Sequence, residues 1–179
     1  MRYLISVPFT LCFSAQPELR QAIAISYGRI NGENGFERLV REMSVASSDQ
    51  DAMKIAIALV SFKEEALNRR ALELSFTGKI NIGHIAYMVI AASSNTESKD
   101  AVWKWFTANS EQLLKTYSGT GLNSAMVENL ISGAGTNRPD EVREYFSKHA
   151  VKEAEMGIRK GLELLEAYTG LMKRLRAGM

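Results

Sequence analysis

Residues 103–149 decide the fold, and they read WKWFTANSEQLLKTYSGTGLNSAMVENLISGAGTNRPDEVREYFSKH. Apolar residues recur in this stretch at intervals of three and four positions, which is the spacing of an amphipathic helix. Gly119 interrupts the pattern, and Pro139 starts it again after a second glycine-containing turn. The stretch therefore predicts three consecutive helices joined by short turns.

The rest of the chain shows the same helical spacing. The first helix is expected to begin at Pro17-Glu18 and to stop at the turn formers of residues 31–35. Further helices are expected from Phe36, from a cap at Ser47 or Ser48, from Lys63 to Phe76 before Gly78, from Ile82 to Ala92, and from a cap at Ser98. No segment alternates at a period of two, so the predicted fold class is all-α.

The helices alternate between apolar and two-faced, and they recur in pairs about every 30 residues. This order predicts an α-solenoid of HEAT or armadillo-like helix pairs. A long C-terminal helix, about Val151 to Arg176, carries one apolar stripe and is expected to cross several earlier helices and close the stack. The alternatives are a compact, non-repetitive bundle for the whole chain and a partner-binding helix or coiled coil for the last helix.

Size and charge indicate a soluble domain or lobe without a strong electrostatic field. The chain has 179 residues and a net charge of +2, and its basic end, Lys173-Arg174 with Arg176, complements the carboxyl end of the last helix. Nucleic-acid binding is therefore not expected, nor is a membrane span, which needs ~18 consecutive apolar residues. The single cysteine, Cys12, excludes an internal disulfide and a cysteine metal cluster. It fits a reducing compartment, or a compartment that left no mark on the sequence, and the expected location is cytoplasmic.

The amino-terminal segment, residues 1–16, resembles a short signal peptide in its apolar run from Tyr3 to Phe13. Pro8 interrupts that run, and Phe13 occupies a position before the possible cleavage point where a small residue is wanted. We therefore expect a docked, partly irregular segment rather than a cleaved one.

Residues that could perform hydrolysis are sparse. His84 and His149 are the two histidines, and neither belongs to the zinc motif H-E-x-x-H, since the position one turn after His84 is Met88. We expect His84 to be a packed or rim histidine and His149 to be a helix-end cation. A serine–histidine pair has no specific support, so no catalytic residue and no metal ligand is predicted.

Other motifs have structural explanations. Gly119-Thr120-Gly121 and Gly133-Ala134-Gly135 resemble fragments of phosphate loops, but neither follows an apolar strand or precedes the lysine that such loops require. Both are expected to end helices. Trp103 and Trp105 cannot share a helix face, so one is expected to pack inward and the other to cover a neighbouring helix or interface, with ligand stacking as the alternative.

Several segments form a specific order when taken with residues 103–149: Pro17-Glu18-Leu19-Arg20, Ala58 to Lys63, Arg69 to Leu74, and Ala101 to Trp103 with Asn109. Together they resemble the helical C-terminal domain of the zinc aminopeptidases that include aminopeptidase N, puromycin-sensitive aminopeptidase and the tricorn-interacting aminopeptidases. Ser110 and the glycines of residues 133–135 depart from the family pattern. The predicted domains are a poorly matching segment, 1–16, and an aminopeptidase C-terminal-like domain, 17–179.

The resemblance implies a HEAT-like bowl that faces a zinc domain, encloses the peptide cavity and shifts between open and closed forms. Zinc, its ligands and the general base would belong to the zinc domain, which removes N-terminal residues from peptides. This chain alone is therefore expected to be inactive, with a peptide substrate or the zinc domain as its partner. The alternative is a free-standing helical-repeat protein that binds a peptide or protein on its concave face.

A lobe of this kind is expected to expose an apolar patch where its neighbour would lie. We place the patch near Tyr3 to Phe13 and expect that it permits homodimers. Substrate-binding residues stay unassigned, because nothing in the sequence selects among the cations Arg20, Arg29 and Lys79 for a substrate carboxylate.

Overall fold

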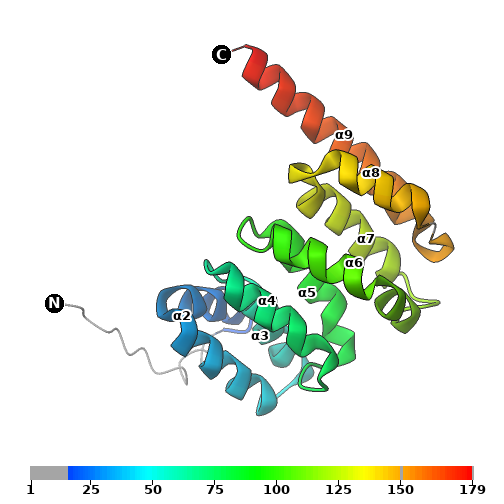
Figure 1. The fold of residues 1–179 in the computed structure, drawn as a ribbon. Helices are drawn as coiled ribbons and strands as arrows, with labels where there is room; N and C mark the ends of the chain where they lie inside the picture. Colours follow the sequence, from blue (N-terminus) through cyan, green and yellow to red (C-terminus); the bar gives the residue numbers. More distant parts are fainter. Residues whose placement is uncertain (1–15, 150, 179) are drawn as a thin grey trace.

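The computed structural model describes residues 16–149 and 151–178. Within these ranges the regular structure consists of α-helices and short 3-10 helices, and no strand occurs (Figure 1). None of the described helices combines the length and the apolar character needed to cross a bilayer. The predicted all-α class is confirmed. The apolar patch expected near Tyr3 to Phe13 lies outside the described residues.

The helices follow one another with short connections. Their bounds are α2 Arg20–Ser44, α3 Asp49–Leu59, α4 Glu65–Glu73, α5 Ile82–Ser94, α6 Lys99–Thr116, α7 Leu122–Gly133, α8 Pro139–Lys148 and α9 Glu155–Ala177. The 3-10 helices are η1 Leu74–Phe76, η2 Ala134–Asn137 and η3 Lys152–Ala154. The predicted helix from Lys63 to Phe76 is thus α4 followed by η1, and Gly78 lies beyond it in the left-handed region, with φ of 79°.

The turn predicted at residues 31–35 is a kink inside one element, α2. Gly32 alone leaves the helical conformation, with φ of 53° and ψ of −128°. A glycine reaches a positive φ without steric cost, so one residue redirects the helix where five turn-forming residues suggested a loop. The two expected helices therefore exist, but they are joined directly.

Two serines predicted as caps act differently. The Ser48 hydroxyl accepts a hydrogen bond of 3.1 Å from the Asp51 backbone N–H, which is the expected cap of α3. Ser98 precedes α6 as predicted but forms no such cap bond. Its buried hydroxyl instead donates to the carbonyl oxygens of Ala92, at 2.8 Å, and Asn95, at 3.2 Å. Ser98 thus ties the start of α6 to the end of α5.

The described helices form two layers that run along the molecule from α2 to α9 (Figure 1). In one layer α3 packs on α5, α5 on α7, and α7 on α9. In the other layer α4 packs on α6. Aromatic rings of α6 contact those of α8, and the ring centroids of Trp103 and Tyr145 are 5.5 Å apart. Successive pairing of this kind is compatible with the predicted α-solenoid.

Glycines set the spacing of the α5–α7–α9 layer. A Cβ atom on Gly133 would lie 2.3 Å from the Ser93 carbonyl oxygen of α5, and one on Gly157 would lie 2.1 Å from the Ser124 carbonyl oxygen of α7. Gly161 likewise faces Ile131 of α7, at 2.8 Å. The prediction that Gly133 only ends a helix is incomplete, because its φ of −92° suits any residue and the close approach of two backbones explains the glycine.

The last helix differs from the prediction in its contacts. It begins after η3, and its inward residues are buried from Ala154 through Gly161 to Leu165. Beyond that point Tyr168 is 50% exposed and Met172 is 49% exposed. As expected, α9 stands at the end of the stack, where it packs mainly on α7 and to a smaller extent on α8 and η2. It does not cross further helices in the described structure, because α7 ends before the apolar stripe of α9 does.

The glycine crossing can be tested with a matched pair of variants. Gly157→Ala is expected to lower the free energy of unfolding by about 2–3 kcal/mol, since the added methyl group forces α7 and α9 apart. Gly170→Ala, later in the same helix, meets no heavy atom within 4 Å and is expected to raise that free energy by about 0.5–1 kcal/mol. Urea unfolding followed by circular dichroism measures both, and equal effects would contradict the proposed crossing.

Candidate functional site

A surface hollow of about 670 Å³ lies between the second half of α2, the start of α3 and the start of α5. Of the residues that line it, the polar and charged ones best suited to contact a ligand are Arg41, Ser48, Asp49, Lys79, Asn81 and His84. This hollow is the candidate site because it contains His84, the histidine that the sequence leaves without an obvious role.

The first turns of α3 and α5 place the groups of the hollow. Asn81 is the N-cap of α5, where its side-chain oxygen accepts a 2.9 Å hydrogen bond from the Gly83 N–H. Its amide nitrogen donates to Asp49 Oδ1 at 3.1 Å. Two helix starts that are far apart in sequence are therefore joined through one carboxylate.

His84 lies beside the same carboxylate. Its Nε2 is 3.0 Å from Asp49 Oδ1, but the direction does not suit a hydrogen bond, so the contact is electrostatic and depends on protonation of the ring. The imidazole is buried, whereas the Asp49 side chain is mostly exposed. Nδ1 of His84 has no hydrogen-bond partner among the described residues.

Tyr117 holds the start of α5 from the opposite side. Its hydroxyl accepts a 3.1 Å hydrogen bond from the Ala86 N–H and donates to the Ile82 carbonyl. Burial raises the pKa of the Tyr117 phenol, so the hydroxyl keeps its proton at neutral pH. The turn that carries His84 is thereby fixed against the end of α6.

The charged or titratable groups that line the hollow are one imidazole, one carboxylate, the Lys79 ammonium and the Arg41 guanidinium. A catalytic zinc ion requires three protein ligands around an open fourth position. No cluster of three or more His, Cys, Asp or Glu side chains suited to a metal occurs in the described part of the chain. The residues of the hollow therefore do not make up a zinc-ligand set.

His149 lies at the other end of the stack, as the C-cap of α8. Its ring stacks on Tyr145 with centroids 4.3 Å apart, and its Nδ1 lies 2.9 Å from the Tyr145 carbonyl oxygen. The predicted helix-end position is confirmed. The two histidines belong to different helices, and neither has a serine partner in the described contacts.

Both tryptophans are buried in the helical core. Trp103 faces α8, where its Nε1–H donates a 2.6 Å hydrogen bond to Glu141 Oε1. Trp105 stacks on Phe76 of η1, with centroids 5.5 Å apart. The prediction that the two tryptophans lie on different faces of α6 is confirmed. Because both rings are buried against neighbouring helices, neither is open to the alternative of ligand stacking.

The three cations considered for a substrate carboxylate do not converge. Arg20 forms a 2.7 Å ion pair with Asp51, and Arg29 forms a 3.1 Å pair with Glu97. Lys79 alone lines the hollow. The sequence analysis did not predict that Asp49 and Asn81 also line this hollow. Each resembles an ordinary residue at a helix start, and the two are 32 positions apart in the chain.

Asp51, near the hollow, is a buried carboxylate with several polar and charged partners. Burial acts to raise its pKa, but hydrogen bonds from Arg20 and Ser48 and the positive charges of Arg20 and Lys54 hold it below its ordinary value. The Asp51 side chain is 3% exposed. It joins the start of α2 to the first turn of α3, next to the candidate hollow.

The described part of the chain is thus an all-α domain whose helices lie in two layers, with a polar hollow at the starts of α3 and α5. The ERAP1-like C-terminal domain model matches residues 13–167, and the chain belongs to this family. The resemblance to the C-terminal domain of aminopeptidases that the sequence suggested is confirmed.

Relatives along almost the whole chain carry aminopeptidase names. The chain is 30% identical over 163 residues to probable aminopeptidase 2 of Sulfurisphaera tokodaii, covering 91% of this chain and 21% of that protein. It is 28% identical to the leucyl aminopeptidase of Saccharolobus solfataricus, with 93% and 21% covered. It is 22% identical to aminopeptidase M1-B of Oryza sativa subsp. japonica, with 90% and 19% covered. The chain therefore spans about a fifth of the length of the curated relatives it matches.

The lowered pKa of Asp51 predicts a pH-dependent stability. Because the carboxylate is favoured in the folded state, its contribution is complete above the unfolded pKa of about 4 and is lost as the pH falls through the folded value. Asp51→Asn is expected to cost about 1–2 kcal/mol at neutral pH, with a smaller difference from the parent in acid.

Urea unfolding at several pH values measures this difference. Asp140→Asn is the matched control, since Asp140 pairs with Arg143 at the exposed surface, where ion pairs contribute little. A cost for Asp51→Asn that stays constant from neutral to strongly acidic pH would contradict the assignment.

Proposed function

We propose that this chain acts as the non-catalytic helical domain of a zinc aminopeptidase. In this role it shapes the peptide cavity and takes part in opening and closing it, while a separate zinc domain removes N-terminal residues from peptides. The observation that carries the proposal is the family match over residues 13–167 together with aminopeptidase relatives that extend far beyond the matched part.

The structure supports this role through shape rather than chemistry. Successive helix pairs give an extended surface of the kind that HEAT-like proteins use for binding. Zinc would be held by the other domain, because the described residues provide no suitable ligand set. We also propose that the substrate of the whole enzyme is a peptide. The proposed location is cytoplasmic, since the single cysteine Cys12 fits a reducing compartment.

A second candidate is a free-standing protein that binds a peptide or protein partner on the concave face. It is favoured by the polar hollow at His84, which needs no zinc domain to bind a ligand. Homodimers through the Tyr3 to Phe13 segment remain a separate prediction. The two candidate functions differ in whether this chain works together with a catalytic zinc domain.

A domain exchange tests the first proposal. The C-terminal fifth of the Sulfurisphaera tokodaii relative is deleted, or replaced by this chain, and hydrolysis of a leucyl reporter amide is measured with zinc present. The deletion is expected to lose most activity, and the chimera to recover to within about tenfold of the parent, since the metal chemistry stays with the parent.

The isolated chain serves as the control and is expected to show no turnover with or without zinc. Zinc-dependent turnover by the chain alone would contradict both candidates. A folded chimera that is no more active than the deletion would contradict the first and leave the second.

A further inference from the structure

The apolar stripe of α9 continues beyond the helices that cover it. Up to Leu165 the stripe is buried or partly buried against α7 and neighbouring residues. One and two turns later, at Tyr168 and Met172, the same side of the helix is half exposed. Leu171 and Leu175 widen the exposed strip along the adjoining face. An uncovered apolar strip of this kind is typical of an interaction surface.

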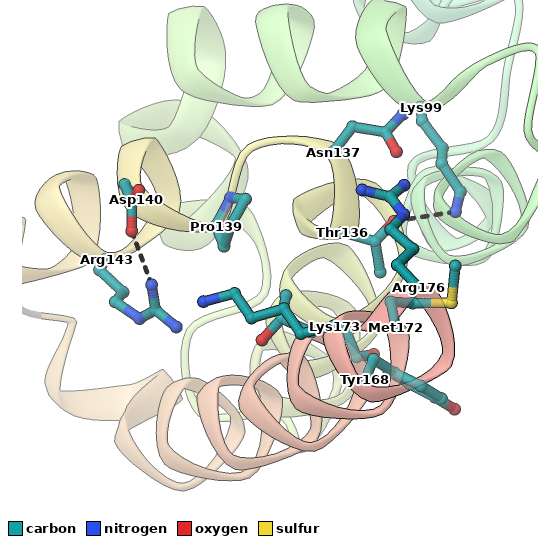
Figure 2. Close-up of a pocket in the computed structure, with 12 residues that line it drawn as sticks. Lys99, Thr136, Asn137, Pro139, Asp140, Arg143, Tyr168, Met172, Lys173 and Arg176 are labelled. Atoms are coloured by element: carbon teal, nitrogen blue, oxygen red, sulfur yellow. Dashed lines mark hydrogen bonds and ion pairs between the residues drawn. The ribbon is translucent and has the colours of Figure 1, made fainter. Parts of the chain in front are cut away.

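A groove lies beside this strip, between the last turns of α9 and the start of α8 with η2. Its volume is about 700 Å³, and Tyr168, Met172 and Pro139 contribute apolar surface to it. Figure 2 shows the side chains of Lys173 and Arg176 extending from α9 into the same space. The groove therefore combines an apolar wall with cationic groups.

The charge of the groove is positive. Lys99, Arg143, Lys173 and Arg176 line it, against the single carboxylate of Asp140. Arg143 is paired with Asp140 at 2.7 Å, and Lys99 donates to the Thr136 hydroxyl at 3.1 Å. Lys173 and Arg176 form no ion pair within the described residues. In the part of the chain that the structure describes, these two cations thus line the groove without a carboxylate partner.

We propose that this groove docks an acidic amphipathic helix of another protein. The apolar face of that helix would cover Tyr168, Met172 and Leu175, as an amphipathic helix lies in an apolar groove. Its carboxylates would pair with Lys173 and Arg176. A charge-complementary contact of this kind accelerates association and selects acidic partners.

Other occupants fit less well. A second copy that presented the same groove would bring like charges together, which a two-fold interface cannot avoid. A lipid surface is flat on this scale, whereas Tyr168, Met172 and the cations border a concave space. Nucleic acid would meet cations mixed with exposed apolar side chains and Asp140, where a continuous basic surface is expected.

The proposal does not rest on the aminopeptidase role, because it is argued from the exposed stripe of α9 and the charge of the groove alone. Its test uses the full chain and a two-heptad peptide of repeat Glu-Leu-Leu-Glu-Glu-Leu-Ala, acetylated and amidated. A peptide with Lys in place of each Glu is the matched probe. Fluorescence anisotropy is expected to show at least about tenfold tighter binding of the acidic peptide at low salt, with the preference reduced at high salt.

Charge-reversal variants locate the contact. Lys173→Glu with Arg176→Glu is expected to weaken binding of the acidic peptide about tenfold or more, since attraction becomes repulsion. Arg159→Glu with Arg174→Glu makes the same change in net charge on the same helix, away from the groove, and is expected to have little effect. Met172→Ser is expected to weaken binding about fivefold at every salt concentration, because it removes apolar contact. Circular dichroism of each variant checks that the helices remain.

Three results would overturn the proposal. Equal effects of the two charge-reversal pairs would mean a non-specific charge effect. Binding of phosphatidylserine vesicles or duplex DNA in place of the acidic peptide would assign the surface to a different class of partner. Light scattering that shows dimers of the parent chain and monomers of Met172→Ser would assign it to a second copy.

Discussion

The structure depends on the close approach of α5, α7 and α9 through glycine. Gly133 and Gly157 each face a serine carbonyl of the preceding helix in the layer, at distances that no side chain permits. Because interiors are packed at near-crystalline density, a single methyl group at such a contact must move a whole helix. The direction of α9 therefore depends on glycine, which has no Cβ atom, at positions 133 and 157.

The second layer is held by aromatic side chains, which need more space than glycine contacts allow. Trp103 of α6 meets Tyr145 and Phe146 of α8, and its ring N–H is satisfied by Glu141. Helix α7 ends at Gly133, and α9 extends beyond it. The last turns of α9 therefore border a positively charged groove.

Local signals in the sequence predicted most helix starts. Pro139 begins α8, and Ser48 caps α3, because each effect depends on the residues within one turn. The apolar period likewise showed which face of α9 is apolar, but periodicity carries no information on whether another helix lies opposite that face. The contact of His84 with Asp49 and the crossing at Gly157 join segments more than 30 positions apart, and neither residue carries a local pattern that names its partner.

Amide hydrogen exchange along α9 tests the central claim most directly, because exchange reports the local free energy of opening. The account predicts strong protection from Gly157 to Leu165, where the helix is locked to α7, and clearly faster exchange from Tyr168 to Arg176, where the same stripe is uncovered. Uniform protection along the whole helix in the isolated chain would contradict the claim that its last turns await a partner.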